Sequence, residues 1–107
     1  MISPMRETSC CSITLDPISK TLKTIAEDNR LRILCLLKSK EHCVCELQEA
    51  LGLPHNLLVH HLGKLKNVGL IESRKQHKYT YYRLSQDHYQ QFLKDINFLL
   101  EVKTHEQ

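Results

Sequence analysis

The sequence contains no tryptophan, and glycine and proline occur only three times each in its 107 residues. This scarcity excludes collagen-like and low-complexity chains, and a content of 41% hydrophobic and 25% charged residues is typical of an ordinary globular domain. No apolar run approaches the roughly 20 residues that a membrane-spanning helix requires, and the N-terminus has no apolar stretch typical of a signal peptide. We therefore expect one cytoplasmic domain with no membrane partner, small enough to benefit from oligomerisation.

Acidic residues are nearly absent from one third of the chain. The segment 52–84 contains six lysines and arginines but only one acidic residue, Glu72, whereas the first 51 residues carry equal numbers of both signs. A protein that grips phosphates needs cationic charge concentrated in this way. No partnered nucleophile and base stand at a recognisable spacing, so we expect no enzymatic activity.

The five cysteines are an odd number, and in a reducing cytosol such a set favours metal binding or redox sensing over disulfides. Residues 1–12 lack a helical apolar period, and we expect a flexible arm that carries the adjacent thiols of Cys10 and Cys11. Neighbouring cysteines rarely form a relaxed disulfide with each other, but two thiols on an arm could close onto one ion. Cys35 lies in a dense apolar run, where we expect a buried structural thiol.

Two further thiols, Cys43 and Cys45, stand one residue apart just before an apolar helical segment. Within a regular helix they would point about 200° apart, so both can face one ion only if Cys43 lies in the non-helical lead-in. At a helix N-terminus the backbone dipole also favours thiolate over thiol, which metal ligation requires. We expect a site for a thiophilic ion here, with His42 as either a further ligand or a solvent-facing loop residue.

Residues 43–51 and 54–68 have the spacing of a helix-turn-helix, with Gly52 at the turn. The second helix has a leucine stripe at helical spacing, formed by Leu58, Leu62 and Leu65. His61 leans towards this stripe, where we expect it to pack. The other faces of the helix lack acidic groups and suit base edges and phosphates. The residues that we predict to contact DNA from this helix are His55, Asn56, Val59, His60, Lys64 and Lys66.

Residues 70–84 change period and are typical of a strand, a polar turn and a second strand, which predicts a basic hairpin, or wing. Four more predicted DNA contacts lie near its tip: Arg74, Lys75, His77 and Lys78. Residues 87–102 form a last helix with an apolar stripe wide enough to bury part of it against a second subunit, and 103–107 are a frayed tail. The expected fold is mainly α with a small β-hairpin, a homodimeric winged helix-turn-helix over 13–102.

Several short motifs occur together between residues 22 and 84: Leu31-Arg32-Ile33-Leu34, Cys43-Val44-Cys45-Glu46-Leu47, Leu51-Gly52-Leu53, His60-His61-Leu62, Leu65, Gly69-Leu70-Ile71 and Tyr81-Tyr82-Arg83-Leu84. In this combination the chain resembles the ArsR/SmtB family of metal-responsive repressors. The resemblance implies a winged-helix homodimer with its first and last helices at the interface. Such a dimer binds double-stranded, palindromic operator DNA and represses its own metal-resistance operon until an ion releases it.

The chain departs from the branches of this family in its cysteines. In one arsenite-sensing branch a third cysteine follows the Cys-Val-Cys motif by three residues, and here Gln48 occupies that position. Branches similar to cadmium and lead sensors use spaced N-terminal cysteines, and another arsenite-sensing branch uses an adjacent pair. This chain combines an adjacent N-terminal pair with the Cys-Val-Cys motif, so the resemblance implies a site shared between the two.

Two other departures limit what the resemblance implies. The C-terminal zinc site of other members expects a ligand eleven residues after His88, where this chain has Leu99, so we expect no zinc there. The recognition helix carries Asn56, Leu57 and Val59 where relatives carry small hydroxyl residues, so no operator sequence is implied.

The inducing ion is left open by this ligand set. Four soft thiolates, from Cys43 and Cys45 with Cys10 and Cys11, favour As(III), Sb(III), Cd(II) or Pb(II) over hard cations. The adjacent pair favours As(III) or Sb(III) as the inducer, with Cd(II) or Pb(II) as the alternative. A redox or persulfide sensor with the same fold is a rival, as is a metal-buffering thiol protein with no DNA role. Whether the arm binds in its own subunit or the opposite one is also open.

Overall fold

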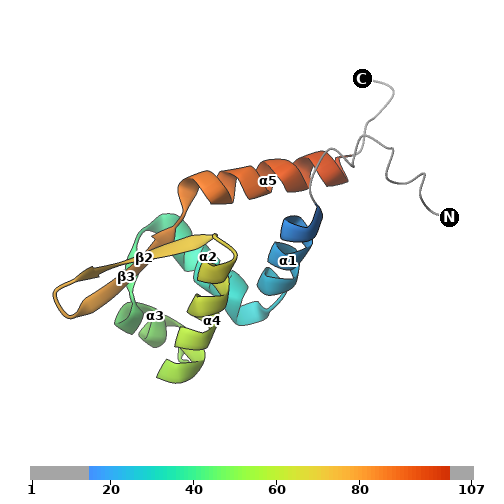
Figure 1. Cartoon of the computed structure of the whole chain (residues 1–107). Coiled ribbons are helices and arrows are strands. Elements are labelled where there is room, and N and C mark those ends of the chain that lie inside the picture. The colour runs from blue at the N-terminus through green and yellow to red at the C-terminus, as the bar shows by residue number, and fades with distance from the viewer. Residues whose placement is uncertain (1–14, 102–107) are drawn as a thin grey trace.

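The structure is a computed structural model that describes residues 15–101 of the chain. Within this range it contains five helices and three strands, which confirms the expected mainly α fold with a small β-hairpin (Figure 1). In chain order the elements are α1 (Leu15–Ile25), α2 (Asp28–Ser39), β1 (His42–Cys43), α3 (Val44–Leu51), α4 (His55–Asn67), β2 (Ile71–Gln76), β3 (Tyr79–Leu84) and α5 (Gln86–Leu100). The predicted arm with Cys10 and Cys11 and the predicted tail at 103–107 lie outside the described residues.

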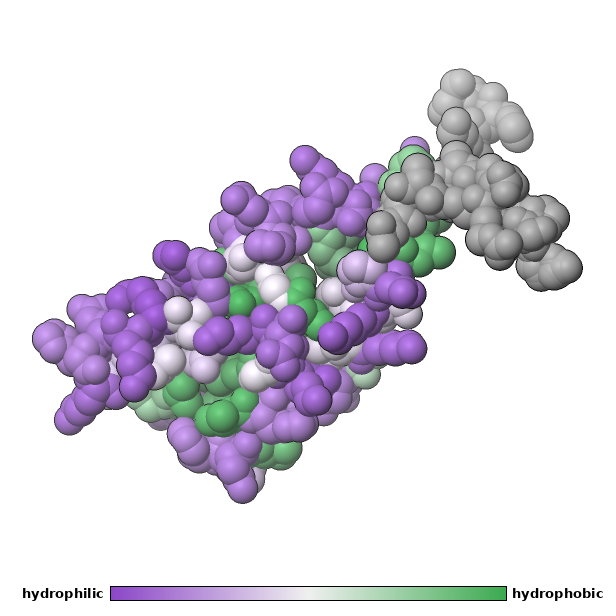
Figure 2. Space-filling view, viewed as in Figure 1, coloured by the Kyte–Doolittle hydropathy of each residue, from purple (hydrophilic) through white to green (hydrophobic). Residues whose placement is uncertain are grey.

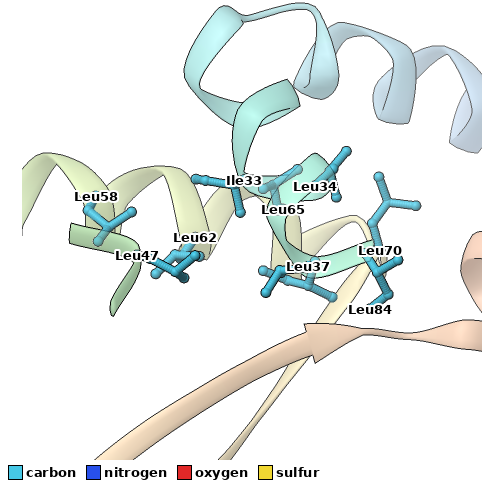
Figure 3. Close-up of a cluster of buried hydrophobic side chains, with 10 residues drawn as sticks. Ile33, Leu34, Leu37, Leu47, Leu58, Leu62, Leu65, Leu70 and Leu84 are labelled. Carbon is cyan, nitrogen blue, oxygen red and sulfur yellow. The ribbon is translucent and has the colours of Figure 1, made fainter. Parts of the chain in front are cut away.

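The core forms where α2 packs against α1, α3, α4 and β3. Figure 3 shows buried side chains from α2, α3, α4 and the hairpin meeting there, and the cluster consists of Ile33, Leu34, Leu37, Leu47, Leu58, Leu62, Leu65, Leu70, Ile71 and Leu84. The predicted inward stripe of α4 is confirmed, because Leu58, Leu62 and Leu65 are all fully buried. Residues three and four apart share one face of a helix, which is why this spacing predicts burial.

The prediction of a buried Cys35 is wrong, because its side chain is exposed on α2. The apolar run around it is dense, but a helix buries only one side. Ile33 and Leu37 point into the core and Cys35 lies about 200° from Ile33 around the helix axis. Composition alone does not show which side of such a run faces the interior.

The turn between α3 and α4 depends on a glycine. Gly52 has φ +66° in the left-handed region, and its N–H donates to the carbonyl of Gln48 at 2.8 Å, which closes the end of α3. This cap lets the chain reverse within three residues before α4 begins at His55. The helix-turn-helix predicted from the sequence is therefore present; α3 ends at Leu51 as expected, and the other three bounds lie one residue inside those expected.

The sheet has three antiparallel strands in the order β1-β3-β2. β2 and β3 form the predicted hairpin, in a register that pairs Ile71 with Leu84, and Figure 1 shows this hairpin projecting from the helices. The additional strand β1 was not predicted: His42 pairs with Tyr82 and Cys43 with Tyr81. Two residues carry no periodicity, so only the partner strand defines them as a strand.

α5 lies along one side of the molecule next to α1 (Figure 1). Every residue of α5 is at least partly exposed, and so are large apolar residues of both helices: Leu15, Leu22, Leu93, Phe98 and Leu100. An apolar surface shared by two neighbouring helices in this way is typical of one that a partner covers. Over residues 15–101, no helix combines the length and the apolar character needed to cross a bilayer.

Candidate functional site

The thiols of Cys43 and Cys45 converge at the entrance of α3. Cys43 is the N-cap residue, with extended backbone (φ −82°, ψ 165°), and it therefore lies outside the helix that Cys45 has already entered. The two Sγ atoms are 2.7 Å apart, with Cys43 buried and Cys45 exposed. The non-helical lead-in that the sequence predicted is thus what brings the two sulfurs together.

Local hydrogen bonds hold this entrance in place. The N–H of Cys43 donates to Oε1 of Glu46 at 3.0 Å, so a carboxylate satisfies one of the free donors at the start of α3. The pKa of the Cys45 thiol is raised, chiefly by its hydrogen bond with Cys43 and then by burial. The backbone N–H groups of Cys45 and Glu46 at the start of α3 act in the opposite direction and lower this pKa, but the neighbouring sulfur has the larger effect. A bound cation would favour the ionised pair again.

The pair has the geometry of half a metal site. Two sulfurs bonded at about 2.3 Å to one tetrahedral ion are about 3.8 Å apart, so the thiols need to separate by only about 1 Å to share an ion. In the part of the chain that the structure describes, no group of three or more His, Cys, Asp or Glu side chains is placed to hold a metal. His42 is half-buried on β1, where alternation directs it to the face opposite Cys43, and its Nδ1 donates to the carbonyl of Lys40 at 2.9 Å.

The segment that carries the thiols is attached to the wing. Nε and Nη2 of Arg74 on β2 each donate to the carboxylate of Glu41 at 2.8 Å, and the guanidinium lies 5.0 Å from the ring centre of Tyr81. The hydrogen bonds from Arg74 lower the pKa of Glu41 below its usual value. Glu41 immediately precedes β1, so this ion pair and the β1–β3 pairing both tie the cysteine segment to the sheet. Sequence reasoning missed Glu41, because nothing local relates two residues 33 positions apart.

The outer surface of α4 has the predicted candidates for contact with nucleic acid. The six are all exposed: His55, Asn56, Val59, His60, Lys64 and Lys66. The end of the helix is joined to the sheet, since Nζ of Lys66 donates to Oγ of Ser73 on β2 at 2.8 Å. The helix therefore presents a polar and cationic surface while its leucines fill the core.

His61 has the packing role expected of it and anchors α4 to α2. Its side chain is buried, and Nδ1 accepts a hydrogen bond from Nε of Arg30 at 3.0 Å. Arg30 also donates through Nη1 to the carbonyl of Thr24, so one guanidinium connects α4 with the end of α1. Burial lowers the pKa of His61, and the neighbouring Arg30 acts in the same direction, whereas Glu27 opposes it.

The predicted wing contacts occupy the hairpin. Four of them are exposed: Arg74, Lys75, His77 and Lys78. His77 takes a left-handed backbone conformation at the turn, with φ 61°, and Lys78 lies 5.7 Å from the ring centre of Tyr79. Arg74 differs from the other three, because its guanidinium is held by Glu41.

A hollow of about 260 Å³ lies between Cys45 and this surface. Its lining comes from the start of α3, the start of α4 and the wing, and consists of Val44, Cys45, Gln48, His55, Lys78, Tyr79 and Thr80. Cys45 thus shares one concave surface with His55 on α4 and Lys78 on the wing. The sequence did not predict this proximity.

Comparison with known proteins shows that this chain is similar to bacterial transcriptional regulators. A family model described as "Bacterial regulatory protein, arsR family" matches residues 27–73. A cadmium resistance transcriptional regulatory protein CadC homolog of Staphylococcus aureus is 32% identical over 71% of this chain and 64% of its own length. A biofilm growth-associated repressor of Xylella fastidiosa is 30% identical over 80% of this chain and 82% of its own. An arsenic resistance transcriptional regulator, ArsR1, of Pseudomonas putida is 38% identical over 58% of this chain and 49% of its own.

Solved structures have the same fold. HlyU from Vibrio cholerae superimposes with a TM-score of 0.66 and 32% identity, over 78% of this chain and 91% of that one. The homodimeric winged helix-turn-helix DNA-binding domain of a possible ArsR-family regulator from Mycobacterium bovis gives a TM-score of 0.68 and 26% identity, over 98% and 99%. The fold is thus a winged helix-turn-helix. The chain spans less than two thirds of the cadmium and arsenic relatives, which extend beyond the matched region.

Proposed function

This chain belongs to the ArsR family of bacterial transcriptional regulators, and on that premise we propose that it is a repressor that leaves its operator when a thiophilic ion binds its cysteines. As(III) or Sb(III) is the proposed inducer, and Cd(II) or Pb(II) the alternative. The protein acts on double-stranded, palindromic DNA in the cytoplasm as a homodimer. We propose no catalytic activity.

The charge and shape of the surface support DNA as the partner. α4 and the wing carry lysines, histidines and asparagines, and α4 has no acidic residue in its sequence. Side chains of these types contact phosphates and base edges in the major groove. The exposed apolar residues of α1 and α5 support the homodimer, since each helix leaves a face unpaired within one chain. Two copies related by a twofold axis would match a palindromic operator.

The proposed ion site consists of Cys43 and Cys45 together with Cys10 and Cys11, which lie outside the described residues. Trivalent arsenic takes three sulfurs and cadmium commonly four, so the described pair supplies part of either set. Soft thiolates favour these ions over Mg(II) or Ca(II). The adjacent Cys10-Cys11 pair and the name of the Pseudomonas relative support As(III), and the name of the Staphylococcus relative supports Cd(II).

One observation carries the proposal: Cys45 lines the same hollow as His55 and Lys78. An ion bound there, with an arm drawn across it, alters the charge and the shape of the surface between α4 and the wing. A coupling of about 1 to 3 kcal/mol between the sites would lower DNA affinity about 5- to 150-fold. By reciprocity, bound operator weakens the binding of the ion by the same factor.

The test is release of the full chain from a duplex that it has itself selected from a random library. As(III), Cd(II), Pb(II), Zn(II) and a persulfide donor are added in parallel under strict reduction, and binding is followed by fluorescence anisotropy. Cys43→Ser and Cys45→Ser should bind the duplex as wild type does and stay bound when the ion is added. Cys35→Ser is the matched control, because this exposed thiol lies on α2 and should leave release intact. Release of the Cys43 or Cys45 variant by As(III) or Cd(II) would show that the ion binds elsewhere.

A redox or persulfide sensor is the second candidate, supported by the 2.7 Å separation of the two sulfurs. Oxidation by a peroxide or a persulfide would join them and release two protons and two electrons to that oxidant. Such a sensor would stay on DNA with every metal under reduction and leave it with the persulfide donor. A metal-buffering protein without a DNA role would select no duplex at any salt concentration.

A further inference from the structure

Two aliphatic side chains of α4 are exposed although the core of the protein is complete without them. Val59 is 42% exposed and Leu57 40%, whereas the neighbouring Leu58 is fully buried. Figure 2 shows apolar surface over the region of α3 and α4, among hydrophilic side chains. An exposed valine stabilises neither the core nor the helix, since β-branched residues lower helix stability slightly. The stability of this chain therefore does not explain why a valine occupies this position, whereas contact with a binding partner would.

Val59 and Leu57 lie on different sides of α4. Residues two positions apart in a helix are separated by about 200° around its axis, so these two side chains point in nearly opposite directions. Val59 lies beside Asn56, one turn before it, and Gly63, one turn after it, and all three are exposed. Leu57 lies on the flank that also carries Lys64.

The row formed by Asn56, Val59 and Gly63 is chemically complementary to the major-groove edge of an A·T pair. The carboxamide of asparagine can bond bidentately to N6 and N7 of adenine, and the 5-methyl of thymine is a contact for small apolar side chains in the major groove. At Gly63 a Cβ atom would meet nothing within 4 Å, so the bare backbone is not required by packing and leaves room for close approach. Arginine, the usual reader of guanine, does not occur in the sequence of α4.

The surrounding charge favours nucleic acid over a protein as the occupant of this row. Lys64 and Lys66 follow on the same helix, and Lys75 and Lys78 lie on the wing, with no acidic residue in α4. Phosphates flanking a groove would pair with these cations, whereas a protein partner would need an acidic rim around an apolar centre.

We infer that Val59 reads the 5-methyl group of a thymine in the major groove, and that the operator half-site has an A·T pair where Val59 and Asn56 meet it. This inference rests on the proposed DNA-binding function and adds the base class to it. Val59 is then a specificity-determining residue, and Leu57 is not part of the readout.

The experiment uses the full chain and the duplex that it selects from a random library. Each thymine is replaced in turn by deoxyuridine, which removes the methyl group and keeps the hydrogen-bonding edge. At the thymine that Val59 contacts, the loss should weaken binding about fourfold, the factor that corresponds to ~0.8 kcal/mol per buried methyl-sized group. Val59→Ala, which shortens the side chain that reaches the methyl group, should weaken binding to the thymine duplex by a similar factor and reduce the difference between the two duplexes.

Leu57→Ala is the matched control, because it removes an equally exposed aliphatic side chain from the other flank of α4. It should retain the full difference between thymine and deoxyuridine. The inference is overturned if no deoxyuridine substitution alters affinity, if Val59→Ala keeps the methyl dependence, or if Val59→Ala changes oligomeric state and not DNA binding. In the first two of these outcomes the chain still selects a duplex, so the proposed function stands. Failure to select any duplex would instead overturn the proposed function.

Discussion

Arg74 on β2 forms a bidentate ion pair with Glu41, the residue before β1, through two hydrogen bonds of 2.8 Å. Glu41 is two residues from Cys43, so the contact places a fixed joint between the wing and the proposed ion site. A displacement of Cys43 on ion binding would therefore be transmitted to β2 as well as to α3. The Glu41–Arg74 ion pair thus links a predicted DNA contact, Arg74, to the proposed ion site.

Glu41→Gln should uncouple the ion from DNA without abolishing either binding event. The amide cannot keep the charge-assisted bidentate pair, so β2 follows the cysteine segment less closely. We expect a smaller ratio between DNA affinities without and with the inducing ion, measured by anisotropy. Glu72→Gln is the control, because it removes an ion pair of the sheet, with Arg83, that contains neither Glu41 nor Arg74. An unchanged ratio in Glu41→Gln, or an equal decrease in both variants, would contradict a role for this joint.

The adjacent leucines at 57 and 58 should differ sharply in their contribution to stability. Leu58 on α4 is fully buried in the core, so Leu58→Ala should lower the free energy of unfolding by about 2 to 5 kcal/mol. Leu57 is 40% exposed, and Leu57→Ala should change it by less than about 0.5 kcal/mol. Urea denaturation followed by circular dichroism measures both. Similar losses in the two variants would mean that α4 is rotated relative to the structure.

Stability should fall as the solution is acidified below the ordinary pKa of histidine. Burial lowers the pKa of His61 in the folded protein below its usual 6.5. The unfolded chain therefore takes up a proton at a higher pH than the folded one, so this stabilisation is complete above about pH 6.5 and is lost as the pH falls from there through the folded pKa. Protonation would also place a proton of Nδ1 against the Nε–H of Arg30.

The measurement compares urea denaturation at about pH 7.5 and about pH 5.5. His61→Gln should reduce the difference in unfolding free energy between the two conditions. His60→Gln, which changes an exposed histidine of the same helix, should keep the wild-type difference. If His60→Gln reduces the difference in unfolding free energy and His61→Gln keeps it, His61 is not the source of this pH dependence.

Two glycines should respond in opposite ways to alanine. Gly52 has φ +66°, which costs an L-residue about 1 to 2 kcal/mol, so Gly52→Ala should destabilise the protein by about that amount. Gly63 is helical and a Cβ there meets nothing within 4 Å, so Gly63→Ala should stabilise it by about 0.5 to 1 kcal/mol. Thermal denaturation of the two variants and wild type tests this. A loss of stability in Gly63→Ala would show that packing, and not DNA, requires the glycine.

Local sequence patterns predicted the helix-turn-helix, the hairpin and the inward stripe of α4. Leu58, Leu62 and Leu65 recur at helical spacing, and the glycine at 52 follows a short apolar helix, so each signal lies within one element. The position of Cys43 before α3 could be deduced in the same way, because side chains two positions apart within a helix cannot face the same ion. The error at Cys35 has the same origin, since its apolar neighbours did not reveal which side of α2 faces inward.

The sequence by itself therefore determined the helix-turn-helix, the hairpin and the inward face of α4, because periodicity acts over three or four residues. Only the tertiary structure decided that β1 joins the sheet, that Glu41 pairs with Arg74, and that Cys45 shares a hollow with Lys78. These contacts join residues 33 to 40 positions apart in the chain. Their formation depends on how the helices pack around α2, and no local pattern encodes that arrangement.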